Sequence, residues 1–173
     1  MDFILAQIFG GIALILVCIG YFLKTKSPFM VMQIISNIFY ASAFFVVGAY
    51  VGAGIVLIST FRCLYLYFAE KKNFKYTLHF LPVFIVLYIV TTILFWGGVY
   101  DFMPLVTSTM FTLAFTIKDL QKMRWVLIIP NSLLIVYNIL KTTYMSAVLD
   151  FVEVVVIIIA IIKFSSDNKE LLK

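Results

Sequence analysis

Two asparagines lie near the middles of long apolar segments, where a polar side chain is costly. Asn37 and Asn131 are 94 residues apart in the chain. Because an unsatisfied polar group inside a bilayer is strongly penalised, both amides should point into a helix bundle or a wet cavity. A side-chain amide offers both donors and an acceptor, so together the two could bind a small polar solute. Each could equally tie neighbouring helices together by a hydrogen bond.

Ionisable residues form a second group. Arg62 lies inside one apolar segment, and Asp150 and Glu153 lie in another, three residues apart on one helix face. Charges within a membrane are functional candidates and are usually paired. A shift of 94 residues aligns Glu153 with Ser59, about one turn from Arg62, so we expect a direct Arg62–Glu153 pair near an inner gate. Such a pair would either fix the packing or act as a latch or a proton-coupled carboxylate.

Four residues that favour helix bends form a third group. Pro104 and Pro130 lie inside apolar segments, and the same shift aligns them with Gly10 and Ser36. A proline inside a helix removes a backbone hydrogen bond and can kink the helix, and Gly and Ser are milder kink residues. We expect these four positions to be hinges, although Gly and Pro are also common in membrane helices generally.

Motifs of catalysis and metal binding are missing from the sequence. It contains no HExxH, no GxSxG and no Gly-rich phosphate loop. Cys18 and Cys63 lie in apolar runs, which is typical of small buried residues. We therefore expect no enzyme activity, no metal, no cofactor and no nucleic-acid partner.

The composition explains what positions these side chains. The chain is 64% apolar and 12% charged, whereas soluble domains are about 45–50% apolar and about 25% charged. Seven runs approach the roughly 20 residues that a membrane-spanning helix needs. The sequence predicts one all-α transmembrane domain in a lipid bilayer, with helices at 3–23, 28–47, 51–68, 78–96, 102–117, 123–140 and 145–164 and a polar tail at 165–173.

The same shift of 94 residues suggests an internal repeat. Residues 3–68 align with 97–162 without a gap, and although only six pairs are identical, they include a loop lysine and the mid-segment asparagine. Two three-helix units can point the same way across a membrane only if one helix separates them. The sequence therefore predicts two parallel repeats, about 3–68 and 97–164, joined by a linker helix at 78–96.

Basic residues predict the orientation. Of 13 Lys and Arg residues, Lys141 lies on one side, Arg62 lies within a span, and the other 11 fall on the opposite side. Because basic short loops stay cytoplasmic, we expect the N-terminus outside and the C-terminus inside. The first apolar run is too long for a signal-peptide core and is expected to be a retained helix.

Three segments carry a resemblance to a known family. They are LAQIFGGIA (5–13), SNIFYASAFFVVGAYVGA (36–53) with Arg62 after it, and PNSLLIVYN (130–138) with Glu153 after it. They resemble the YgjV family of small bacterial inner-membrane proteins. The three-plus-one-plus-three layout is also similar to the PQ-loop group, including the SWEET and PnuC transporters, although the chain has no Pro-Gln dipeptide. That likeness implies two triple-helix bundles around a central cavity with proline-type hinges.

These observations favour a permease for a small polar metabolite in the bacterial inner membrane, working by alternating access. Asn37 and Asn131 would contact the solute, and Tyr40 and Tyr137 would line or close the cavity. The alternative is a receptor or assembly protein that binds a ligand or partner without transporting it. The sequence leaves both a monomer and a homo-oligomer open.

Overall fold

A computed structural model describes residues 2–46, 48, 50–72, 80–96, 98–141 and 144–170. The described chain is helical throughout. Its elements are α1 (Asp2–Tyr21), α2 (Lys26–Val46), α3 (Tyr50–Lys71), α4 (Leu81–Leu94), the short 3₁₀ helix η2 (Val99–Asp101), α5 (Phe102–Ala114), α6 (Leu120–Leu140) and α7 (Tyr144–Glu170). Four of them, α1, α2, α3 and α6, are long and apolar enough to cross a bilayer.

Most helix boundaries fall within three residues of the expected ones, and the differences have local causes. α6 begins at Leu120 rather than at residue 123, because the Asp119 carboxylate caps it by accepting hydrogen bonds from the backbone N–H groups of Gln121 and Lys122. α7 continues to Glu170, six residues beyond the expected end. α4 begins at Leu81, and the expected start at residues 78 and 79 lies outside the described residues.

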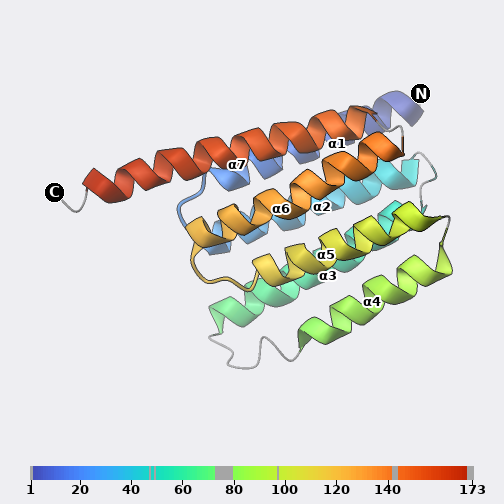
Figure 1. Ribbon diagram of the computed structural model, residues 1–173, viewed down its shortest axis with the longest axis horizontal. Helices are drawn as coiled ribbons and strands as arrows, with labels where there is room; N and C mark the ends of the chain where they lie inside the picture. The colour runs from blue at the N-terminus through green and yellow to red at the C-terminus, as the bar shows by residue number, and fades with distance from the viewer. Residues whose placement is uncertain are drawn as a thin grey trace.

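The helices form two layers (Figure 1). α1, α2 and α3 make the rear layer, with α7, α6 and α5 in front of them in that order, and α4 lies at one edge beside α5. Hydrogen bonds join the layers, from Arg62 of α3 to Thr112 of α5 and from Tyr40 of α2 to Glu153 of α7. Successive helices run in opposite directions, so α1, α3, α5 and α7 all point toward the end of the bundle that carries the C-terminus.

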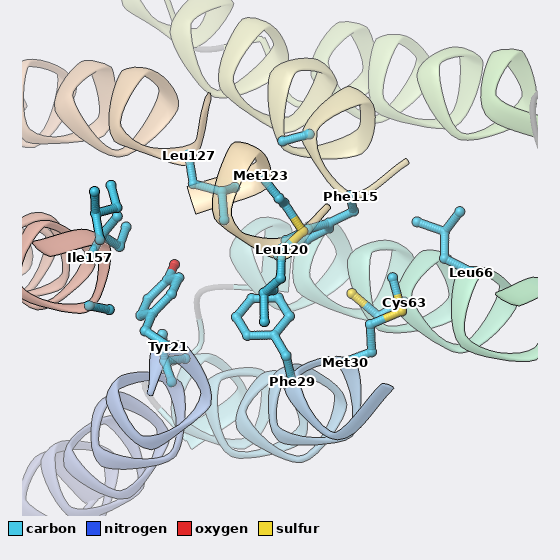
Figure 2. Packing of buried hydrophobic residues seen from close by; sticks show 14 residues of the cluster. Tyr21, Phe29, Met30, Cys63, Leu66, Phe115, Leu120, Met123, Leu127 and Ile157 are labelled. Carbon is cyan, nitrogen blue, oxygen red and sulfur yellow. The ribbon is translucent and has the colours of Figure 1, made fainter. Parts of the chain in front are cut away.

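We call that end the basic end, because Lys24, Lys26, Lys71, Lys118 and Lys122 all lie there. The largest cluster of buried apolar side chains fills the half of the bundle next to it (Figure 2). Its members come from the last turns of α1, α3 and α5, the first turns of α2 and α6, and α7. They include Tyr21, Phe29, Met30, Cys63, Leu66, Phe115, Leu120, Met123, Leu127 and Ile157.

The outer surface of the bundle is apolar. Among the side chains that the structure describes, forty large hydrophobic ones are exposed, including Ile93 and Leu94 of α4 and Ile158 and Ile162 of α7. Patches of this extent are far larger than a soluble monomer exposes, so the surface fits the hydrocarbon of a bilayer.

Candidate functional site

An acidic cluster joins α2, α6 and α7 inside the bundle. The side-chain amide of Asn138 donates a hydrogen bond to Asp150 Oδ2 at 2.6 Å, and the Tyr40 hydroxyl donates to Glu153 Oε1 at 3.4 Å. The two carboxylates lie on one face of α7, three residues apart, and both are half-buried. We define the acidic cluster as Tyr40, Asn138, Asp150 and Glu153.

The polar groups continue from this cluster toward the basic end. Asn131 lies two turns from Asn138 on α6 and is only 1% exposed. Its Nδ2 donates to the carbonyl of Leu127 at 2.8 Å, so this donor is used within its own helix. The hydroxyl of Tyr21, from α1, interacts with the Asn131 side chain. In Figure 2 this hydroxyl points between Ile157 of α7 and Leu127 of α6.

Three polar pairs therefore follow one another down the bundle and end on the apolar cluster; we call them the polar line. Four helices contribute to it, from Asn138 and Asp150 near one end, through Tyr40 and Glu153, to Asn131 and Tyr21. Its carboxylate and amide oxygens accept hydrogen bonds, and its hydroxyl groups both donate and accept. Such a line can bind a solute rich in hydrogen-bond donors or carry a proton. No group of three or more His, Cys, Asp or Glu residues suited to a metal occurs within the described residues.

The predicted Arg62–Glu153 pair is wrong in this structure. The guanidinium of Arg62 donates through Nη1 to Thr112 Oγ1 at 3.0 Å, to the Tyr88 hydroxyl at 3.3 Å and to the Ser108 carbonyl at 3.4 Å. Glu153 instead accepts from Tyr40. The reason is the packing: α3 lies beside α2, α4 and α5, whereas α7 lies beside α1 and α6, so Arg62 and Glu153 face different neighbours.

The two predicted solute-binding asparagines have different environments. Asn131 is buried in the polar line, whereas Asn37 is half-buried and its side chain makes no hydrogen bond to a described residue. The neighbouring Ser36 does bond across helices, because its hydroxyl donates to the Ala13 carbonyl of α1 at 3.0 Å. Tyr137 is half-buried on α6, next to Asn138 of the acidic cluster.

The four predicted hinges also differ. Pro130 is buried inside α6, where its missing N–H interrupts the backbone ladder. Pro104 lies in the first turn of α5, where the backbone N–H has no partner within the helix. A proline at this position does not bend the helix. Gly10 lies in open space, since a methyl group added there would meet nothing within 4 Å. Ser36 holds α2 to α1, as described above.

The basic end is closed by a second group of polar contacts that the sequence analysis missed. Arg124 is only 2% exposed, although the sequence analysis counted it with the basic loop residues of one side of the membrane. Its Nη2 donates to the Leu23 carbonyl at 2.6 Å and its Nη1 to Gln121 Oε1 at 2.9 Å, while Gln121 Nε2 donates to the Ile161 carbonyl at 2.7 Å. These bonds connect the α1–α2 link to α6 and α7. The only signal in the sequence was the position of Arg124 at the start of the expected helix at 123–140.

Asn138 and Tyr21 are further site residues that were missed. Asn138 lies seven positions after Asn131, a spacing that places both amides on one face of a helix. Tyr21 is the last residue of α1, and only its burial, with 1% exposed, distinguishes it from an interfacial tyrosine.

Comparison with known proteins gives one match. A family model described as a bacterial inner membrane protein, Imp-YgjV, matches residues 4–168. No curated protein and no solved structure matches the chain. Because the family model covers nearly all of the described helices, the chain belongs to the YgjV family of bacterial inner membrane proteins.

Proposed function

We propose that this protein is a permease for a small polar solute, working by alternating access between α1–α3 and α5–α7. The observation that carries the proposal is the polar line inside an apolar bundle. It begins at Asn138 and Asp150 and stops against the apolar cluster at Tyr21. Polar and charged groups inside a membrane are costly and usually mark a solute or ion pathway.

A burial pattern supports the idea that the two helix triplets are repeats. The first and last residues of α6 lie 94 positions after the first and last residues of α2. The first residue of α7 likewise lies 94 positions after the first residue of α3. Five of the six buried positions described for α2 fall on buried positions of α6 at this shift. The pairs are Lys26 with Leu120, Phe29 with Met123, Met30 with Arg124, Gln33 with Leu127, and Ser36 with Pro130.

The outer helices of each triplet follow the same pattern. The buried pairs of α1 and α5 are Ala13 with Thr107, Gly20 with Ala114, and Tyr21 with Phe115. The buried pairs of α3 and α7 are Ala53 with Ala147, Cys63 with Ile157, and Leu66 with Ala160. Equivalent buried faces on units that run the same way favour a twofold relation about the membrane normal. Repeats of that kind rock against each other in small transporters.

The acidic cluster favours a solute that donates hydrogen bonds. Asp150 and Glu153 supply acceptor oxygens on one face of α7, and Tyr40 and Asn138 hold them from facing helices. By the positive-inside rule the basic end is cytoplasmic, so the cluster would be entered from outside.

Uptake into proteoliposomes tests the proposal. A panel of labelled polar solutes, including amines, polyols and nucleosides, is offered to the purified protein. Glu153→Gln and Asn131→Ala should each lower uptake of the transported solute at least tenfold. Asn37→Ala is the matched control, because its amide has the same chemistry and no described bond, and it should change uptake by less than about twofold.

Binding measured on the same samples separates the two functional candidates. Saturable binding without uptake would favour a receptor instead of a permease. If neither Glu153→Gln nor Asn131→Ala changes binding or flux of any solute, the polar line is not the solute site.

A further inference from the structure

Arg62 and Arg124 are both buried without a carboxylate partner among the described residues, and in each the buried Nε makes no hydrogen bond. They differ at Nη2, which donates to the Leu23 carbonyl in Arg124 but reaches no oxygen of a described residue in Arg62. The side chain of Arg62 is 4% exposed, although it lies near the middle of α3. The carboxylates whose side chains the structure describes are engaged elsewhere: Glu70 pairs with Lys26, Asp119 caps α6, and Asp150 and Glu153 belong to the acidic cluster. Burying a charge without an opposite charge is expensive, even when neutral dipoles surround it.

Neutral groups compensate only one side of the guanidinium. Nη1 donates to three oxygens, those of Tyr88, Ser108 and Thr112. The ring of Phe115 lies 4.9 Å from the guanidinium carbon and adds a cation–π contact. Three acceptors and an aromatic ring therefore fix the plane and orientation of the group.

The other edge of the guanidinium has no oxygen partner among the described residues. Nε is buried and makes no hydrogen bond, and Nη2 reaches only the sulfur of Cys63 at 3.9 Å, which is a weak acceptor. Nε and Nη2 together form the edge with which arginine binds a carboxylate through two parallel hydrogen bonds. A lysine could not offer this geometry.

The neighbours of Arg62 indicate how an anion would reach it. Cys63, Leu66 and Phe115 are buried and close the side toward the basic end. Ser59, one turn toward the opposite end, is half-buried and hydrogen-bonded to Tyr88 at 3.0 Å. An anion would therefore have to enter past Ser59, from the end of the bundle opposite to the basic end.

From this geometry we propose that the Nε–Nη2 edge of Arg62 is a binding site for the carboxylate of a small organic acid, between α3, α4 and α5. The carboxylate accepts one hydrogen bond from Nε and one from Nη2 and neutralises the buried cation. This site is separate from the acidic cluster, and the proposal does not depend on whether the protein transports a solute.

Nitrogen NMR of the arginine side chains tests the proposal directly, because the chain has two arginines, Arg62 and Arg124. The full-length protein is labelled with [ε-¹⁵N]arginine in nanodiscs, and Arg62→Lys identifies which Nε–H signal is which. Sodium acetate is the probe, with acetamide as the neutral isostere and sodium chloride at equal ionic strength. Acetate should shift the Arg62 signal saturably, and the Arg124 signal should stay in place.

Three results would overturn the site: no saturable shift with acetate, an equal shift with chloride or acetamide, or an equal shift of Arg124.

A variant on the opposite edge of the guanidinium provides a further check. Thr112→Val removes one acceptor from Nη1 and leaves the Nε–Nη2 edge intact, so its acetate response should persist within about threefold in affinity. Loss of uptake with a retained acetate response would count against the permease alone.

Discussion

The two halves of the bundle bury different kinds of side chain. Next to the basic end many of the buried residues are large, such as Tyr21, Phe29 and Leu127, beside small ones such as Ala114 and Ala160. The buried residues of the opposite half include the small Ala6, Ala41, Ala53, Ala147 and Thr107. Because lipid is as apolar as the core, membrane helices are held together by close packing and hydrogen bonds. In the basic-end half, large side chains of neighbouring helices pack between one another. In the opposite half, small side chains let the helix backbones approach closely.

This difference assigns separate mechanical roles to the two halves. The basic-end half is also fastened by Arg124, which holds the α1–α2 link to α6. The opposite half contains the acidic cluster, whose described bonds join one side chain to another across helices. We therefore expect the opposite half to open more readily and the basic-end half to stay closed.

Truncation of a large core residue should have the largest effect. Leu127→Ala leaves a cavity at a fully buried position of α6, and such changes cost about 2–5 kcal/mol. Ala147→Gly in the opposite half should cost only about 1 kcal/mol, mainly through helix propensity. Thermal unfolding in a mild detergent measures both. Equal losses would remove the distinction between the halves.

Removal of the arginine contact at the basic end should come next. Arg124→Met keeps most of the volume but loses the hydrogen bonds to Leu23 and Gln121, and bonds to charged groups are each worth about 1.5–3 kcal/mol. Hydrogen exchange should rise in the segment around Leu23. Lys122→Met is the control, since Lys122 lies two residues before Arg124 and is exposed. Unchanged exchange in Arg124→Met would show that the apolar cluster alone closes this end.

A double-mutant cycle should show a moderate effect and sharpen the assignment of partners. Tyr40→Phe removes the donor of one hydrogen bond and Glu153→Gln removes the charge of its acceptor, so their effects on stability should differ from additivity by about 0.5–1 kcal/mol. Arg62→Leu combined with Glu153→Gln should be additive within about 0.5 kcal/mol, because the two side chains have separate partners. If Arg62 and Glu153 were coupled and Tyr40 and Glu153 were not, the Arg62–Glu153 pair expected from the sequence would be correct.

Two glycines of α1 should give the smallest effects, of opposite sign. Gly10→Ala adds a methyl group into open space and should stabilise by about 0.5–1 kcal/mol through helix propensity. At Gly20 an added Cβ would lie 3.3 Å from Met32 Cβ in the tightly packed half, so Gly20→Ala should destabilise. Unfolding midpoints of the two variants check the signs. Stabilisation at Gly20 would mean that α1 and α2 can separate easily there.

The sequence predicted the helices well because hydrophobic length is a strong signal in a membrane protein. The alignment anchored on Lys24 with Lys118 and Asn37 with Asn131 also anticipated the matching bounds of α2 and α6. Local chemistry was less visible: the Asp119 cap moved the start of α6 to Leu120, and the burial of Arg124 had no signal in the sequence. The partners of Arg62 could not be predicted, since an alignment gives the depth of a residue in the membrane but not the direction in which its helix face points. That direction depends on how α3 packs against α4 and α5.

The lengths of α4 and α5 have a consequence for the surrounding lipid. With 14 and 13 residues, these helices rise only about 20 Å, whereas a typical hydrocarbon layer is about 30 Å thick. Acyl chains along this edge must shorten, tilt or disorder to match it, at a cost of fractions of a kcal/mol per ångström. We therefore expect a thinner bilayer along the edge beside Arg62, and membranes with short-chain lipids should accommodate this protein with the least elastic strain.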